Sequence, residues 1–129
     1  MQKIVFIGYG AMAQSVHELM PDTVQLQAVV VLPESIEQIK ALVPVDTQVV
    51  SKISQIKGQP DLVLEMAGQA GLRAHAFDVL SQRWPLAVVS VGALADKQLF
   101  DALSEAARQH ETQIHLLAGA VAGMDIPLE

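Results

Sequence analysis

Short apolar runs rich in valine and isoleucine alternate along this chain with stretches whose apolar residues recur at helical spacing. Runs of this kind are typical of strands buried on both faces of a parallel sheet, and the helices between them predict crossover connections. The predicted strands cover residues 3–7, 26–32, 48–51, 61–66, 86–91 and 113–117. The predicted helices cover residues 11–20, 35–42, 97–109 and a stretch from after Gly71 to about residue 82, and Asp96 is expected to cap the last of them in chain order. The pattern therefore predicts a doubly wound, mainly parallel α/β sheet of about six strands with helices on both faces.

Length and composition narrow the class of protein. A chain of 129 residues has room for one domain, and 51% apolar against 17% charged residues excludes a disordered chain. No apolar stretch approaches the roughly 18 residues of a membrane span, and the N-terminus does not resemble a signal peptide. The absence of cysteine excludes disulfides and thiolate metal sites, which fits a cytoplasmic location. A net charge of −6 without a basic cluster disfavours nucleic acid as a partner.

A glycine fingerprint follows the first predicted strand and opens the first predicted helix. It reads Gly8-x-Gly10-x-x-Ala13, in the context that the dinucleotide fingerprint G-x-G-x-x-G/A requires. Gly8 permits the tight turn, Gly10 lets the backbone approach a pyrophosphate, and Ala13 allows the helix to pack closely on the strand. A tight turn without a ligand is the alternative. We expect a Rossmann-type sheet that binds NAD or NADP, with a cradle made of Gly8, Tyr9, Gly10, Ala11, Met12 and Ala13.

The choice between NAD and NADP depends on the end of the second strand, where an acidic residue ordinarily grips the adenosine ribose. Leu32 occupies roughly that place, and Glu34 lies two residues later. Glu34 is a candidate for the ribose contact, but a solvated loop carboxylate is an equal alternative. No arginine that would accept a 2′-phosphate stands nearby. The choice of cofactor therefore stays open.

Small-residue turns follow four of the predicted strands, which in a parallel sheet end at one edge. Such turns would let an extended ligand lie close to backbone, although glycine is common in any turn. Ser90 is a further candidate for a contact to cofactor or substrate. The alternative is that its hydroxyl only hydrogen-bonds to the backbone at the strand end. No histidine lies near a second ligand at metal spacing, so we expect no metal site and no catalytic residue in this chain. The turns after the first comprise Ala67, Gly68 and Gln69, Gly92 and Ala93, and Gly119 and Ala120.

Four motifs in this order and spacing resemble those of the L-aspartate dehydrogenase family. They read GYGAMA at 8–13, LEMAGQ at 64–69, VSVGALAD at 89–96 and AGAVAGMD at 118–125. The resemblance covers nearly all of that family's N-terminal Rossmann domain. It implies NAD(P)-dependent oxidative deamination of L-aspartate to iminoaspartate, which hydrolyses to oxaloacetate or feeds nicotinamide-ring synthesis. It also implies that residues 67–69 and 90–93 lie along the cofactor, with Ala120 near the nicotinamide.

This chain departs from the family pattern at three positions. Ala118 stands in place of the family's serine, Ala122 in place of a glycine, and Leu32 where many members carry the ribose-binding aspartate. These departures bear on the choice of cofactor more than on the fold.

Members of the family are about twice as long, and their second, α+β domain supplies the substrate pocket, the catalytic histidine and the dimer interface. The resemblance therefore implies a dinucleotide-binding domain over residues 1–127, with a missing C-terminal domain as its partner. Residues 128–129 resemble a cloning scar. We expect the chain alone to be inactive and the full-length protein to be a homo-oligomer. Two alternatives remain: another Rossmann oxidoreductase, similar to homoserine dehydrogenase or dihydrodipicolinate reductase, or a non-enzymatic nucleotide-sensing module.

Overall fold

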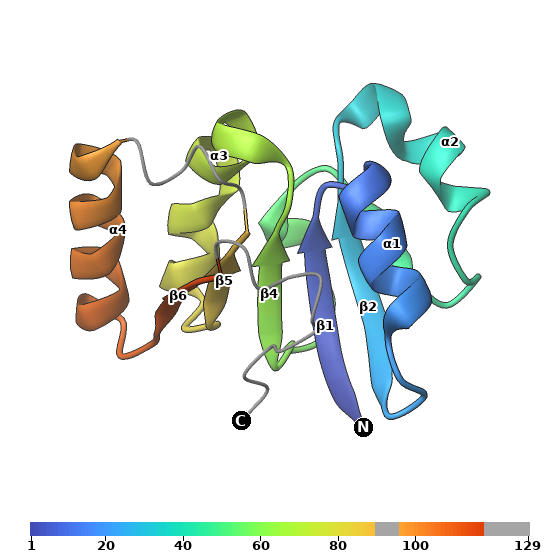
Figure 1. Ribbon diagram of the computed structural model, residues 1–129, viewed down its shortest axis with the longest axis horizontal. Coiled ribbons are helices and arrows are strands. Elements are labelled where there is room, and N and C mark those ends of the chain that lie inside the picture. Colours follow the sequence, from blue (N-terminus) through green and yellow to red (C-terminus); the bar gives the residue numbers. More distant parts are fainter. Residues whose placement is uncertain (90–95, 118–129) are drawn as a thin grey trace.

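The described strands form one sheet in the order β3-β2-β1-β4-β5-β6, and every neighbouring pair is parallel (Figure 1). The structure is a computed structural model and describes residues 1–89 and 96–117. The strands are β1 (Gln2–Ile7), β2 (Val24–Val30), β3 (Gln48–Val50), β4 (Leu62–Glu65), β5 (Leu86–Val88) and β6 (Ile114–Leu116). The chain runs outward from β1 to β3, then returns to start β4 on the other side of β1. The predicted doubly wound sheet is confirmed, and its switch point lies between β1 and β4.

Helices cover both faces of the sheet. They are α1 (Ala11–Leu19), α2 (Ile36–Lys40), α3 (Gly68–Ser81) and α4 (Lys97–Gln109), with short 3₁₀ turns at Pro33–Ser35 and Ile53–Gln55. Side chains alternate along β1: Val5 and Ile7 join the core under α3 and α4, whereas Ile4 and Phe6 join the core under α1 and α2. This two-sided burial explains why the strand is apolar at every one of these positions.

Several predicted boundaries shift. β2 ends at Val30, two residues earlier than predicted, because the chain turns into the 3₁₀ helix that begins at Pro33. Beyond the strand, the Val31 N–H still donates to the Val50 carbonyl at 2.8 Å. Helix α3 begins at Gly68, although the small residues up to Gly71 were expected to form a turn. The described part of β5 ends at Val88, and the last predicted residues of that strand lie outside the described residues.

Across residues 1–89 and 96–117, no helix is both long enough and apolar enough to cross a membrane.

Candidate functional site

The carboxyl ends of β1, β2 and β4 meet at one edge of the sheet. The Gly8 N–H donates to the Val30 carbonyl at 2.8 Å, and the Met66 N–H donates to the Ile7 carbonyl at 2.9 Å. The first glycine turn therefore stands at the switch point, between the ends of β2 and β4. In open α/β sheets this is the crevice where ligands bind.

The two glycines of the fingerprint meet different surroundings. Gly8 has a φ of +94°, and a Cβ atom there would lie 2.9 Å from the Cβ of Ala67, so the position requires glycine. A Cβ atom on Gly10 would have no atom within 4 Å. Gly8 therefore makes the turn, whereas Gly10 keeps the approach to the turn open. Ala13 is fully buried on the α1 side of the sheet, which allows the close packing of α1 on β1.

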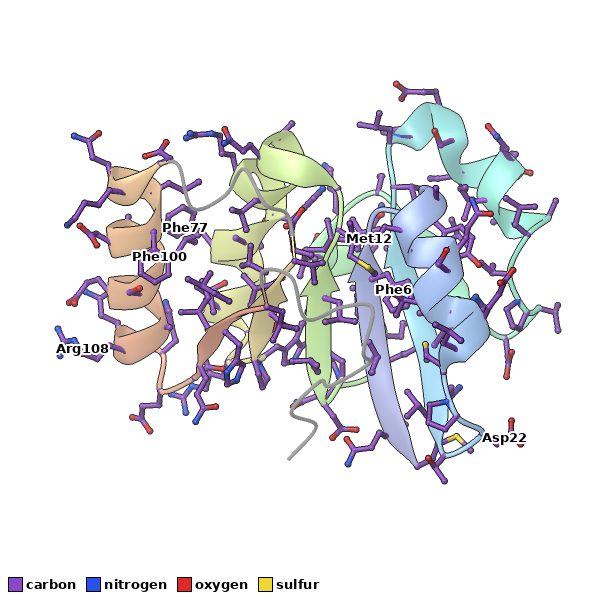
Figure 2. All side chains as sticks on the ribbon, viewed as in Figure 1. Phe6, Met12, Asp22, Phe77, Phe100 and Arg108 are labelled. Carbon is purple, nitrogen blue, oxygen red and sulfur yellow. The ribbon has the colours of Figure 1, made fainter. Side chains whose placement is uncertain are left out.

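The start of α1 offers uncapped backbone donors. Gly10 is the N-cap residue, it provides no side-chain cap, and the first turn carries no acidic residue. The first N–H groups of a helix have no partner within the helix, and together with the helix dipole they favour an anion. Ala11 and Met12 begin the helix, and Met12 lies at the carboxyl end of β1 with Phe6 further down the strand (Figure 2). The residues of this turn fit the pyrophosphate of a dinucleotide.

A hollow of about 240 Å³ lies between this turn and the end of β2. Leu32 and Ser35 both line this hollow, and Leu32 is 65% exposed. Glu34 is exposed in the 3₁₀ turn and is not part of the lining, so its contact with a ribose stays a prediction. The lining residues are Gly8, Tyr9, Gly10, Val31, Leu32, Ser35 and Ile39, and none of them carries a charge.

The second small-residue turn is held by a buried carboxylate. Glu65 is fully buried, and its Oε2 accepts a hydrogen bond from the Ala67 N–H at 2.8 Å. A Cβ atom on Gly71 would lie 2.5 Å from the Cβ of Ala67, so Ala67 sits between two glycines, Gly8 and Gly71. Gly68 has a φ of +86° and leads directly into α3, which also carries Gln69. The structure thus brings Ala67 against the first turn, and its contact with a cofactor stays a prediction.

Tyr9 differs from its neighbours in the cradle because its side chain is engaged within the protein. Its ring stacks on Phe6 with a centroid separation of 6.5 Å, and its hydroxyl lies 2.7 Å from Nδ1 of His17. Its carbonyl accepts from Gln14 Nε2 at 3.3 Å. The sequence alone indicates no role for His17 or Gln14, because side-chain contacts across eight and five residues have no local signature.

The remaining predicted contacts, Ser90, Gly92, Ala93 and Ala120, lie outside the described residues. Asp96 caps α4 as predicted: its Oδ1 accepts from the Leu99 N–H at 3.0 Å. Its other oxygen pairs with Arg73 of α3. The Leu99 N–H first, and Arg73 second, lower the pKa of the Asp96 carboxyl. Within the described ranges, no group of three or more His, Cys, Asp or Glu side chains is placed to hold a metal ion.

A parallel sheet of this strand order, with a glycine turn at its switch point and an uncapped helix after it, defines a dinucleotide-binding Rossmann domain. Residues 8–117 match the family profile described as "Homoserine dehydrogenase, NAD binding domain". The chain belongs to this family of NAD-binding domains. The match confirms the predicted class of cofactor, NAD or NADP.

The L-aspartate dehydrogenase of Acinetobacter baumannii is 44% identical to the chain over 125 residues, which are 97% of this chain and 48% of that protein. The chain thus spans about half the length of the curated relatives it matches, and the predicted resemblance to L-aspartate dehydrogenases is confirmed.

Two solved structures share the fold. The WlbA dehydrogenase of Bordetella pertussis, in complex with NADH and UDP-GlcNAcA, matches with a TM-score of 0.70 at 12% identity, over 88% of this chain and 36% of that one. The aspartate dehydrogenase of Thermotoga maritima matches with a TM-score of 0.61 at 12% identity, over 90% of this chain and 45% of that one.

Proposed function

We propose that the chain binds NAD(H) or NADP(H) along the carboxyl edge of its sheet, as the nucleotide-binding half of an L-aspartate dehydrogenase. One observation carries the first part: the turn at the switch point leaves Gly10 facing open space beside the uncapped N-terminus of α1. The backbone from Gly8 to Ala13 would hold the pyrophosphate. The hollow beside Leu32 and Ser35 would take the adenosine half.

The nicotinamide half would then extend toward β4. Ala67 contacts Gly8 and starts the turn into α3, which supports Ala67, Gly68 and Gln69 as proposed contacts of the cofactor in that direction. Ser90, Gly92, Ala93 and Ala120 stay proposed contacts of the same half. When bound, the nicotinamide ring supplies a hydride acceptor. This chain's own part is to bind and orient the dinucleotide.

The second part of the proposal concerns the whole protein. In it, L-aspartate and NAD(P)⁺ would give iminoaspartate, NAD(P)H and a proton. Support comes from the 44% identity to an L-aspartate dehydrogenase over 97% of the chain. In the proposed whole protein a C-terminal domain supplies substrate recognition and catalysis, the assembly is a homo-oligomer, and the 129-residue chain alone is inactive.

Titration of the chain with NADH and with NADPH, followed by nicotinamide fluorescence, tests the first part. We expect saturable binding of at least one of them and of ADP-ribose, which carries the same pyrophosphate. A chain that stays folded by circular dichroism and binds none of the three would overturn the proposed cofactor site.

Reading the gene beyond the codon for Pro127, and assaying its whole product, tests the second part. We expect NAD(P)⁺ reduction that depends on L-aspartate, and none from the 129-residue chain alone. L-Homoserine is the matched alternative substrate, because the family profile carries the name of homoserine dehydrogenase. Reduction with homoserine and not with aspartate would overturn the substrate assignment, and a stop codon at that point would favour a nucleotide sensor.

A further inference from the structure

We propose that Gln14 and His17 are positioning residues of the cofactor site, which act by fixing Tyr9 in the first glycine turn. We call these three residues the Tyr9 clamp. The inference rests on the proposed function, since it assigns a role in dinucleotide binding to two side chains outside the glycine fingerprint.

The clamp holds Tyr9 at both ends of the residue. The hydroxyl lies 2.7 Å from Nδ1 of His17, and the carbonyl accepts from Nε2 of Gln14 at 3.3 Å. Both partners come from α1: Gln14 closes its first turn and His17 lies near its end. Tyr9 is 9% exposed, and its ring packs against Phe6 and, edge to face, against the His17 imidazole, with centroid separations of 6.5 and 5.9 Å.

The state of the two side chains suits a neutral hydrogen bond. Burial is the main cause that lowers the pKa of His17 and raises the pKa of Tyr9. Glu18, the next residue on α1, opposes the effect of burial on His17 and adds to it on Tyr9. At neutral pH the hydroxyl is therefore protonated and the imidazole neutral, and the imidazole tautomer decides which of the two donates in this hydrogen bond.

A clamp matters here because Tyr9 lies between Gly8 and Gly10. Glycine has more backbone freedom than any other residue, so a turn with glycine on both sides of one residue has many conformations of similar energy. The pyrophosphate contacts depend on the direction of the backbone N–H groups at Gly10 and just after it. Fixing the one side chain in this turn restricts those groups before the ligand arrives, and binding then loses less conformational entropy.

The test measures NADH affinity in four variants. Tyr9→Phe keeps the ring and removes the hydroxyl, His17→Leu removes the hydrogen-bond partner of that hydroxyl, and Gln14→Ala removes the contact to the Tyr9 carbonyl. We expect each substitution to lower the affinity for NADH about three- to tenfold, which is the range for the loss of one hydrogen bond. The fourth is the double variant Tyr9→Phe/His17→Leu. It should bind NADH no more weakly than the single variant that binds it less well, because both substitutions remove the same hydrogen bond.

Two readouts separate positioning from general destabilisation. His17→Asn places a side-chain amide, which can donate or accept, near the Nδ1 position, so it should restore most of the affinity that His17→Leu loses. Adenosine, which lacks the pyrophosphate, should bind the wild type, Gln14→Ala and His17→Leu equally, because neither Gln14 nor His17 lines the hollow proposed for the adenosine half. Ser15→Ala is the matched control, because Ser15 is exposed on the same helix and is not part of the clamp.

Equal NADH affinity in the wild type, Tyr9→Phe and Gln14→Ala would overturn the clamp while leaving the cofactor site intact. Additive losses in the double variant, or an equal loss for adenosine, would also overturn it. If Tyr9→Phe does not fold, Gln14→Ala and His17→Asn decide the question. A wild-type chain that binds neither NADH nor ADP-ribose would overturn the proposed function itself.

Discussion

Gly8 and Ala67 lie against each other at the switch point of the sheet, so close that a Cβ atom on Gly8 would stand 2.9 Å from the Cβ of Ala67. The two residues belong to turns that are far apart in the sequence, one after β1 and one after β4. Because Gly8 and Ala67 touch, the two turns are packed against each other at the carboxyl edge of the sheet. A change at either residue should therefore affect both the fold and the cofactor site.

Gly8→Ala tests this contact. The new methyl group would meet Ala67, and the residue would have to adopt a φ of +94°. Left-handed backbone costs roughly 1–2 kcal/mol and overpacking roughly 1–3 kcal/mol, so we expect a loss of about 2–5 kcal/mol in the free energy of unfolding. Urea denaturation measures it, and NADH affinity should fall in the fraction that remains folded.

Gly58→Ala is the matched control for backbone strain. Gly58 has a similar φ of +89°, but a Cβ atom there would meet only the amide end of the Gln27 side chain, at 3.1 Å, and no backbone atom. We expect a loss of about 1–2 kcal/mol with unchanged NADH affinity. A Gly8→Ala variant no less stable than Gly58→Ala would contradict the tight contact with Ala67.

Gly10→Ala should separate binding from stability. The backbone there is ordinary for any residue, with φ at −80°, and a Cβ atom would meet nothing within 4 Å. Exchanging glycine for alanine at an N-cap costs up to about 1 kcal/mol, so the fold should persist. The methyl group would occupy the space proposed for the pyrophosphate, and we expect NADH affinity to fall at least about tenfold. Unchanged affinity by fluorescence titration would place the pyrophosphate elsewhere.

The fold was largely predictable because its causes are local or periodic. Apolar runs mark the strands, Gly8 and Ala13 mark the first turn and helix, and Asp96 caps α4 through its own carboxylate. The start of α3 was missed for a reason that is not local. Gly71 reads as a turn residue, but the structure needs glycine there because Ala67 comes too close for a Cβ atom.

The site was predictable only in part, because several of its contacts join residues that are not neighbours in a local sequence pattern. The fingerprint names Tyr9 as one residue of the cradle, and no pattern in the sequence shows that its hydroxyl reaches His17. Nor does sequence show that the Glu65 carboxylate turns back to the N–H of Ala67. Both contacts depend on how the chain folds back on itself.

The stability of the chain should fall as the solution is acidified from pH 7 to pH 5. Burial lowers the pKa of His17 and of His75 below the ordinary 6.5, so the unfolded chain binds more protons than the folded chain in this range. Urea denaturation at several pH values measures how the free energy of unfolding changes with pH. A His17→Asn variant should lose less of that free energy between pH 7 and pH 5. The lowered pKa of Asp96 acts in a separate window, below its ordinary 3.8. A free energy of unfolding that stays constant or rises between pH 7 and pH 5 would contradict this account.

Leu32→Asp should shift the selectivity of the chain toward NADH. Leu32 lines the hollow beside the first turn, where a carboxylate would accept hydrogen bonds from the ribose hydroxyls of NADH and repel the 2′-phosphate of NADPH. We expect the ratio of NADPH to NADH dissociation constants to rise at least about tenfold. Leu32→Asn, of similar shape and without charge, is the control and should move the ratio much less. If neither variant changes the ratio, the ribose does not lie beside Leu32, and Glu34→Gln then tests the only other acidic candidate that the sequence offered at this strand end.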